Sequence, residues 1–290
     1  MSATNNFLTG QLPQDSGVLG GGRMGAGIAH ALLISGSTVV VVERDEASAQ
    51  AAYERVTESV DKSIARGVVR ESKDELMQRF SVSTDYQQFA TAQLVIEAVP
   101  EIWDLKVSSL QAVEQVLAPE AVLASNTSSL SVNGLAKELA RPGKFLGLHF
   151  FNPVPASTLI EVVIGEQTEK NLVDASRGWV QALGKTAVVV NDAPGFASSR
   201  LGVAIALEAM RMVEEGVASA EDIDNAMVLG YKHPTGPLKT TDIVGLDVRL
   251  GIAEYLHETL GERFAPPQIL KDMVAEGKLG RKSGRGFYSW

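Results

Sequence analysis

Short runs of β-branched residues alternate with longer amphipathic stretches between Gly17 and about Val190. This alternation is typical of parallel strands joined by crossover helices, so it predicts an α/β fold with a doubly wound, mostly parallel sheet. The stretch from Glu46 to Phe80 is too long for an ordinary crossover and predicts a helical arm with one buried face. The predicted strands are Gly17–Gly20, Thr38–Glu43, Leu94–Val99, Val122–Asn126, Phe145–Phe151, Leu159–Ile164 and Ala187–Val190.

The β-branched runs stop at the segment from Asn191 to Gly195, and helical patterns continue to the end of the chain. Since 290 residues are enough for two domains of usual size, this change marks a domain boundary. We therefore predict a loose leader over residues 1–16, a sheet domain over residues 17–191 and a second, all-helical C-terminal domain over residues 192–290.

Charge and cysteine content exclude several classes of function. Twenty-six basic residues against 35 acidic ones give a net charge of −9, which disfavours attraction to nucleic acid or anionic lipid. The absence of cysteine excludes disulfides, thiolate metal sites and a cysteine nucleophile, and four histidines argue against a histidine-rich metal site. The first sixteen residues lack the basic start and apolar core of a secretory signal, and no apolar run is long enough to span a bilayer. We expect a cytoplasmic protein that binds no metal, nucleic acid or membrane.

A glycine-rich turn, Gly20-Gly-Gly22-Arg23-Met24-Gly25, follows the first predicted strand and opens a helix. In a dinucleotide site, Gly20 would form the tight turn, Gly22 would let the backbone approach a pyrophosphate, and Gly25 would pack the helix against the sheet. The N-terminus of that helix would also favour the anion. On its own, the pattern is equally compatible with a flexible turn.

Glu43 supplies the context that favours the dinucleotide interpretation. It ends the next strand 18 residues after Gly25, close to the roughly 20 typical of the acidic residue that binds the adenosine ribose. The alternative for Glu43 is a solvated carboxylate at a strand end. Its charge would repel the 2′-phosphate of NADP, although the neighbouring Arg44 weakens that exclusion, so we predict NAD as the cofactor.

His149 and Glu161 each interrupt an apolar run that is predicted to form a strand. If the two strands pair antiparallel around the turn at Pro153 to Ala156, His149 and Glu161 lie opposite one another, within reach of a hydrogen bond. Such a carboxylate orients the imidazole and stabilises its protonated form, as a general base requires. The alternative is a core histidine bonded to a backbone carbonyl.

The chain from residue 17 to residue 289 resembles the NAD-dependent (S)-3-hydroxyacyl-CoA dehydrogenase family, including its 3-hydroxybutyryl-CoA members. The resemblance implies a Rossmann-type NAD domain, a helical domain that binds substrate, and an acyl-CoA substrate. The segments that carry it are Ser125–Leu130, Leu148–Pro155, Asp192–Phe196 and Gly280–Tyr288. The run Leu201–Leu207 is apolar on more than one helix face, so we predict a homodimer through the helical domain; the alternative is a helix buried wholly within its own subunit.

The same resemblance implies roles for individual residues. His149 is the catalytic base, Glu161 its partner, and Ser128 a hydroxyl donor to the substrate oxygen. The family positions that contact the cofactor on its ribose and nicotinamide side are Glu101, Lys106, Asn152 and Lys282. Without the resemblance, we would interpret Glu101 and Lys106 as a surface ion pair, Asn152 as part of a turn-forming Asn-Pro and Lys282 as part of a solvated basic tail.

One position departs from the family pattern. Ser199 stands immediately before Arg200, where the family has an asparagine whose amide polarises the substrate carbonyl. A serine hydroxyl is shorter and supplies one donor instead of two, so it reaches directly, acts through a water, or the substrate sits deeper. The departure affects rate and substrate range more than the type of reaction.

Ser59, Lys62 and Arg66 have the spacing of one helical face in the predicted arm. The resemblance places Ser59 and Arg66 at positions that contact CoA, with arginine in place of the more usual lysine. Their alternative is a solvated face, since Glu58 and Asp61 lie nearby. The sequence therefore predicts reversible oxidation of a 3-hydroxyacyl-CoA by NAD, with two alternatives: a related dehydrogenase of a free hydroxy acid such as a sugar acid or carnitine, and a non-catalytic NAD sensor.

Overall fold

The computed structural model describes residues 10–290, and the chain divides into two compact units between Asp192 and Ala193. The first unit contains one eight-stranded sheet in the order β3-β2-β1-β4-β5-β6-β7-β8. Neighbouring strands run parallel except β6 and β7, which pair antiparallel. The strands are β1 (Asp15–Leu19), β2 (Thr38–Val42), β3 (Phe80–Ser83), β4 (Leu94–Glu97), β5 (Val122–Ser125), β6 (Phe145–Phe150), β7 (Leu159–Ile164) and β8 (Thr186–Asn191).

The predicted doubly wound sheet is confirmed, and each predicted strand ends within two residues of an observed one. Two differences are informative. The predicted leader is too long, because Asp15 and the buried Ser16 already belong to β1, while residues 1–9 lie outside the described range. The edge strand β3 was missed, because only Phe80 of its four residues is buried and the segment therefore lacks an apolar run.

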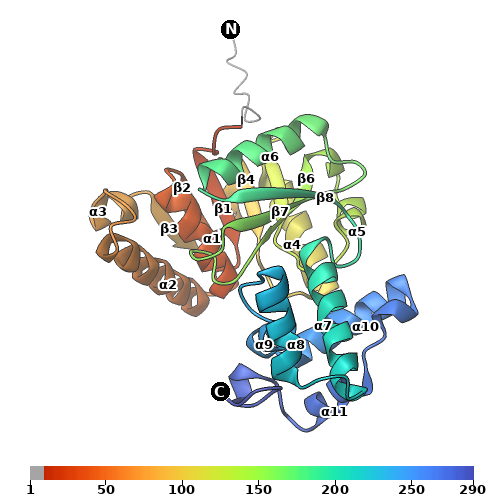
Figure 1. Cartoon of the computed structure of the whole chain (residues 1–290). Coiled ribbons are helices and arrows are strands. Elements are labelled where there is room, and N and C mark those ends of the chain that lie inside the picture. The colour runs from red at the N-terminus through yellow and green to blue at the C-terminus, as the bar shows by residue number, and fades with distance from the viewer. Residues whose placement is uncertain (1–9) are drawn as a thin grey trace. The chain divides into compact units, whose positions relative to one another are not determined.

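The helices of the first unit connect its parallel strands (Figure 1). Helix α2 begins at a cap in which Asp45 accepts a hydrogen bond from the backbone N–H of Ser48, and α2 with α3 forms the predicted arm. These helices are α1 (Arg23–Ile34), α2 (Glu46–Ala65), α3 (Lys73–Met77), α4 (Trp103–Val116), α5 (Val132–Lys137) and α6 (Lys170–Ala182), with short 3-10 turns at Tyr86–Phe89 and Pro142–Lys144.

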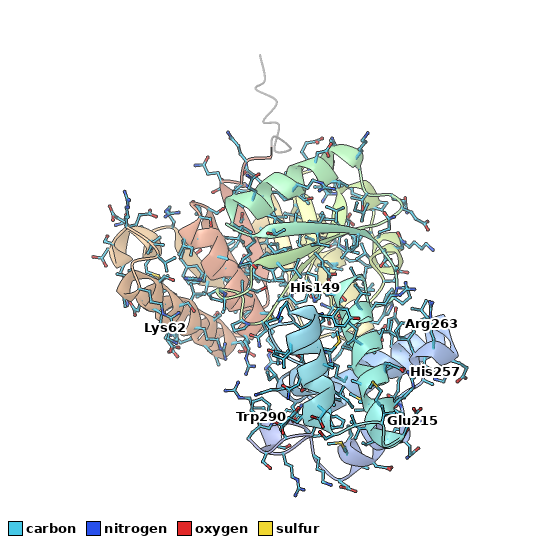
Figure 2. All side chains as sticks on the ribbon, viewed as in Figure 1. Lys62, His149, Glu215, His257, Arg263 and Trp290 are labelled. Carbon is cyan, nitrogen blue, oxygen red and sulfur yellow. The ribbon has the colours of Figure 1, made fainter. Side chains whose placement is uncertain are left out.

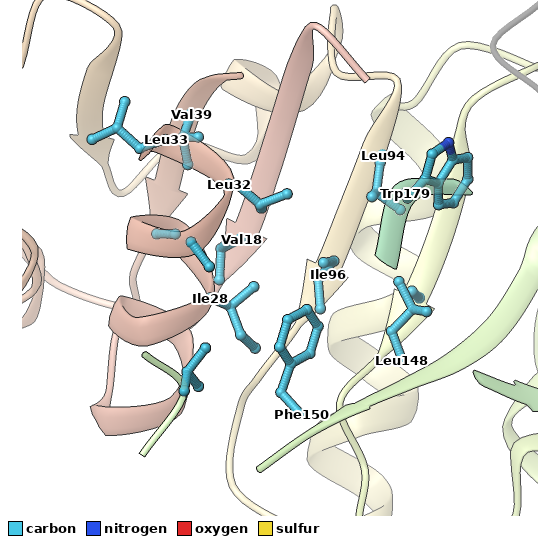
Figure 3. Close-up of a cluster of buried hydrophobic side chains, with 14 of the residues drawn as sticks. Val18, Ile28, Leu32, Leu33, Val39, Leu94, Ile96, Leu148, Phe150 and Trp179 are labelled. Atoms are coloured by element: carbon cyan, nitrogen blue, oxygen red, sulfur yellow. The ribbon is translucent and has the colours of Figure 1, made fainter. Parts of the chain in front are cut away.

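Alternate residues of the central strands bury a large apolar core on one face of the sheet (Figure 3). Ile96 of β4 and Leu148 of β6 point into this core, which α1, α2 and α6 cover with side chains such as Ile28, Val56 and Trp179. Because side chains alternate along a strand, the residues between these core positions point to the opposite face. That opposite face carries the polar side chains described below.

His30 is a buried histidine within this core region. Its Nε2 lies 2.9 Å from Ser63 Oγ, which joins α1 to α2. Burial, helped by the charge of Lys185, lowers the pKa of His30 to about 4. The ring is therefore neutral in the folded protein at neutral pH and packs between α1 and α2.

The second unit is all helical, as the sequence predicts, and has its own apolar core around Val203, Leu246 and Leu256. Buried Asp242 holds the C-terminal tail, because it accepts hydrogen bonds from the backbone N–H groups of Phe287 and Tyr288. No helix within residues 10–290 is both long and apolar enough to cross a membrane. The helices are α7 (Ser198–Glu214), α8 (Ala220–Asn225), a π-helical turn (Ala226–Gly230), α9 (Pro237–Val244), α10 (Leu246–Leu260) and α11 (Gln268–Ala275), with 3-10 turns at Glu262–Phe264 and Arg281–Ser283.

Candidate active site

The functional side chains of the first unit gather at the carboxyl edge of the parallel strands. Glu97 and Ser125 end β4 and β5, and His149 is the second-last residue of β6, opposite Glu161 of β7. Their strand neighbours point into the large core, so these four polar side chains share the other face. In open α/β sheets, ligands bind at this carboxyl edge.

The glycine turn after β1 has the shape of a dinucleotide cradle. Gly20 has a φ of +89°, which side-chain-bearing residues rarely adopt. A Cβ at Gly25 would lie 1.7 Å from the carbonyl oxygen of Gly20, so α1 can approach the turn only with glycine there. A Cβ at Gly22 would meet nothing within 4 Å, and Gly22 and Arg23 are exposed whereas Met24 is half-buried. The turn and the N-terminus of α1 therefore fit a pyrophosphate.

Glu43 lies beside this turn, after the end of β2. Its carboxylate accepts hydrogen bonds from the backbone N–H groups of Gly21, at 2.7 Å, and Arg44, at 3.1 Å. Sequence reasoning missed Arg55 of α2, whose guanidinium donates to the carbonyl of Gly21 at 3.2 Å. The acid is thus fixed against the cradle, where it suits a ribose with free hydroxyls better than one with a 2′-phosphate.

His149 and Glu161 form the predicted pair. The two residues are directly opposite in the antiparallel ladder of β6 and β7, and His149 Nδ1 lies 2.8 Å from Glu161 Oε2. His149 is 6% exposed and Glu161 is fully buried. Because the carboxylate accepts the proton on Nδ1, the neutral ring carries its basic lone pair on Nε2. Figure 2 shows His149 at the sheet of the first unit.

Glu101 organises the loop that carries Ser128. One carboxylate oxygen accepts hydrogen bonds from Thr127 Oγ1, at 2.6 Å, and from the backbone N–H groups of Ser128 and Ser129, each at 2.9 Å. Partial burial alone would raise the pKa of Glu101, but the charge of Lys106 and these hydrogen bonds outweigh it and lower that pKa below its usual value. Glu101 is therefore ionised at neutral pH and fixes the backbone on which the exposed Ser128 sits.

Lys106 does not lie on the surface. Its side chain is 1% exposed, and its ammonium lies 2.7 Å from Glu97 Oε1, 3.1 Å from the carbonyl of Val99 and 3.3 Å from Glu101 Oε2. Three acceptors match the three donors of an ammonium group. Glu97 is fully buried, and its other oxygen accepts a hydrogen bond from Ser125 Oγ at 2.6 Å. This placement favours an indirect role for Lys106, in which it orients Glu101.

Sequence reasoning missed Glu97, although one signal could have revealed it: Glu97 is a carboxylate in an otherwise apolar strand, nine residues before a lysine. Asn152 lies in the exposed turn after β6. Asn126, which follows β5, fixes the end of β6, because its amide oxygen accepts a hydrogen bond from the backbone N–H of Phe150 at 2.8 Å.

The arm carries the residues predicted to meet CoA. Ser59 donates its hydroxyl to the carbonyl of Arg55, one turn earlier in α2, and Lys62 forms an exposed ion pair with Glu58 at 2.6 Å. Arg66 is the exposed C-cap residue of α2, and no residue within 10–290 forms an ion pair with it or accepts a hydrogen bond from its guanidinium. Lys62 is labelled on α2 in Figure 2.

Two predicted site residues belong to the second unit. Ser199 is half-buried in the first turn of α7. Lys282, in the C-terminal tail, donates to Asp247 Oδ2 at 2.6 Å. In the part of the chain that the structure describes, no cluster of histidine and acidic side chains could hold a metal ion.

Two family models together match nearly the whole chain. The NAD binding domain of 3-hydroxyacyl-CoA dehydrogenase matches residues 15–193, and the C-terminal domain of the same enzyme matches residues 195–290. The glycine cradle and the His149 and Glu161 pair lie within the first match, and Ser199 lies within the second.

Individual proteins are similar over nearly their full length. A probable 3-hydroxybutyryl-CoA dehydrogenase of Deinococcus radiodurans is 40% identical, over 94% of this chain and 99% of that protein. The mitochondrial hydroxyacyl-coenzyme A dehydrogenase of Mus musculus is 38% identical, over 94% of this chain and 90% of its own length. The crystal structure of (S)-3-hydroxybutyryl-CoA dehydrogenase from Ralstonia eutropha matches with a TM-score of 0.91 at 38% identity, covering 96% of this chain and 99% of that one.

Proposed function

The chain belongs to the 3-hydroxyacyl-CoA dehydrogenase family and has its NAD-dependent activity, and on that basis we propose which of its residues carry the reaction. His149 Nε2 accepts the proton of the substrate 3-hydroxyl, and Glu161 stabilises the imidazolium that results. NAD, held by the glycine turn and Glu43, would supply the acceptor for the hydride of C3. In the reverse direction, His149 returns the proton to the 3-oxygen. The observation that carries this proposal is the buried 2.8 Å contact between His149 and Glu161 at the carboxyl edge of the sheet.

The remaining residues hold the reactants in our proposal. The backbone of Gly20, Gly22, Arg23, Met24 and Gly25 holds the pyrophosphate, and Glu43 binds the adenosine ribose. Ser128 and Ser199 donate hydroxyls to the substrate oxygen. Glu101, Asn152 and Lys282 hold the nicotinamide side, with Lys106 acting through Glu101.

The substrate is a 3-hydroxyacyl-CoA in this proposal, and Ser59 and Arg66 of the arm bind its nucleotide. The exposed Arg66 supports this assignment, because a guanidinium can bind two phosphate oxygens at once. Asp61 lies nearby in the arm but bonds to Lys73, at 2.8 Å.

We also propose that the enzyme is cytoplasmic.

A panel of substrates tests the proposed function through the absorbance of NADH. We expect turnover of (S)-3-hydroxybutyryl-CoA with NAD and little with NADP, since Glu43 would face the 2′-phosphate in a partly desolvated site. The free acids 3-hydroxybutyrate and carnitine should be poor substrates. A preference for a free acid would instead support the alternative, a dehydrogenase of free hydroxy acids. Equal kcat/KM values for NAD and NADP would contradict the proposal that Glu43 discriminates against the 2′-phosphate.

We propose further that the helical unit forms a homodimer. Leu201 and Ile205 lie one turn apart on α7 and are 63% and 38% exposed, whereas Val203 and Leu207 of the same run are buried. An exposed apolar pair on one helix face is stabilised when a second subunit covers it. Light scattering at micromolar concentration should give the mass of a dimer, and Leu201→Glu should shift it toward the monomer. A monomeric wild-type protein is the contrary result.

A further inference from the structure

A buried arginine in the helical unit has no partner. Arg249 of α10 is 8% exposed, and no residue within 10–290 accepts a hydrogen bond from its side chain or forms an ion pair with it. Its Nε atom is fully buried without a hydrogen-bond acceptor. Burial lowers the pKa of Arg249 below its ordinary value, and no acid within the described residues offsets that shift. A guanidinium nevertheless stays charged at neutral pH, so the fold holds an uncompensated cation.

The guanidinium packs against α7 at the one position of that helix that lacks a side chain. A Cβ at Gly202 would lie 3.2 Å from Nη1 and 3.7 Å from Nη2 of Arg249. Ser199 precedes Gly202 by three residues and shares its helix face. Neighbouring positions three apart on a helix face are about 5–6 Å apart, so Arg249 packs against the position next to Ser199 on that face.

Neither Asp247 nor Glu254, the two acids nearest to Arg249 along the chain, pairs with it. Asp247, two residues before Arg249, bonds to Lys282 at 2.6 Å. Asp242 accepts hydrogen bonds from Phe287, Tyr288 and the indole of Trp290, at 2.9 Å each. The helical unit therefore provides no carboxylate for Arg249, and an anion from outside the unit would supply the missing charge.

We infer that Arg249 binds a carboxylate of the substrate, next to the position where Ser199 meets the reacting oxygen. This inference rests on the proposed function, which places the substrate oxygen at Ser199. Two substrates present such a group: a 3-hydroxyacyl-CoA whose acyl chain ends in a carboxylate, and a free 3-hydroxy acid. The planar fork of an arginine binds a carboxylate with two parallel hydrogen bonds, and Nη1 and Nη2, which lie beside Gly202, can supply them.

Three substrates separate the sources of the carboxylate. They are (S)-3-hydroxyhexanoyl-CoA, the matching 3-hydroxyhexanedioyl-CoA, which differs only by its terminal carboxylate, and free 3-hydroxybutyrate. We expect wild type to prefer the diacid thioester. Arg249→Met, which keeps an unbranched apolar stem and removes the guanidinium and its charge, should raise KM for that substrate about 10- to 100-fold and change KM for the neutral thioester less than about twofold.

Further variants guard against a purely structural effect. Arg249→Lys keeps the charge without the fork and should restore part of the preference. Gly202→Ala, whose Cβ would press on Nη1 and shift the guanidinium by a few tenths of an ångström, should weaken binding of the diacid alone. Arg263→Met removes an exposed arginine of the same unit and should change neither KM. Melting temperatures by circular dichroism identify a variant that fails to fold. If Arg249→Met does not fold, the KM values of Gly202→Ala for the neutral and diacid thioesters provide the test.

The outcomes are distinct. A KM effect confined to free 3-hydroxybutyrate supports the carboxylate site with the free acid as its ligand. An equal rise in KM for the neutral and the diacid thioester in Arg249→Met would overturn the inference. A dimer that dissociates in Arg249→Met while both KM values stay unchanged would also overturn it, and would show that a second subunit supplies the carboxylate. A wild-type enzyme that oxidises none of the thioesters would contradict the proposed function itself.

Discussion

Replacing His149 by alanine should lower kcat about 10²- to 10⁴-fold, with the affinity for NADH nearly unchanged. The reason is that the variant loses the group that accepts the hydroxyl proton, while the glycine cradle and Glu43 remain intact. Turnover is measured at saturating substrate, so that a change in binding does not contribute. Glu161→Gln should have a smaller effect, since it weakens the orientation and charge stabilisation of a base that is still present.

His257→Ala is the matched control for this experiment. His257 is also paired with a glutamate, since its Nε2 lies 3.1 Å from Glu262 Oε1, but the pair is exposed and belongs to the second unit. The kcat of His257→Ala should stay within about twofold of wild type. Loss of a solvated ion pair has little effect on stability, so the fold that positions His149 stays intact. Near-wild-type turnover by His149→Ala would show that another group removes the proton.

Replacing Lys106 by methionine should lower the free energy of unfolding by about 3–5 kcal/mol, because Glu97 would then be a buried carboxylate without a cation. The two side chains are 1% and 0% exposed, and Glu101 would lose the same ammonium. Urea unfolding followed by circular dichroism measures the effect. The double variant Glu97→Gln and Lys106→Met should recover part of the loss, since it removes both buried charges.

Lys62→Met provides the comparison for this second prediction. Lys62 also forms a 2.6 Å ion pair with a glutamate, but its side chain is 61% exposed, so its loss should cost less than about 1 kcal/mol. If Lys106→Met were no more destabilising than Lys62→Met, the buried network would not hold the loop that carries Ser128. The folded fraction of Lys106→Met should also show a raised KM for NAD, because Glu101 loses its orienting partner.

The sheet and the histidine pair could be predicted because short-range patterns determine them. Alternating apolar runs specify the strands, and a turn between two such runs places His149 opposite Glu161. The edge strand β3 was not predicted, because only one of its four residues is buried and its sequence therefore shows almost no alternation of buried and exposed positions. The start of β1 was placed too late for a similar reason, since Asp15 and Ser16 are polar although Ser16 is buried.

The side-chain networks could not be predicted, because they join elements that meet only after the sheet has formed. Glu97 lies at the end of β4, Ser125 at the end of β5 and Lys106 in α4, and parallel pairing of β4 with β5 brings the first two together. The pattern of residues does not tell whether Lys106 is buried, so a surface ion pair was the alternative to the cofactor contact that the family resemblance implies. Arg249 is a similar case, since only packing against Gly202 distinguishes it from a solvated arginine.

The transfer of deuterium from substrate to cofactor tests the central claim most directly. (S)-3-hydroxybutyryl-CoA labelled with deuterium at C3 is incubated with the enzyme and NAD, and the reduced cofactor is analysed by mass spectrometry. We expect NADH to carry the label from C3, because the hydride leaves that carbon as His149 takes the hydroxyl proton. Unlabelled NADH, or an acyl product that retains the deuterium at C3, would contradict this claim.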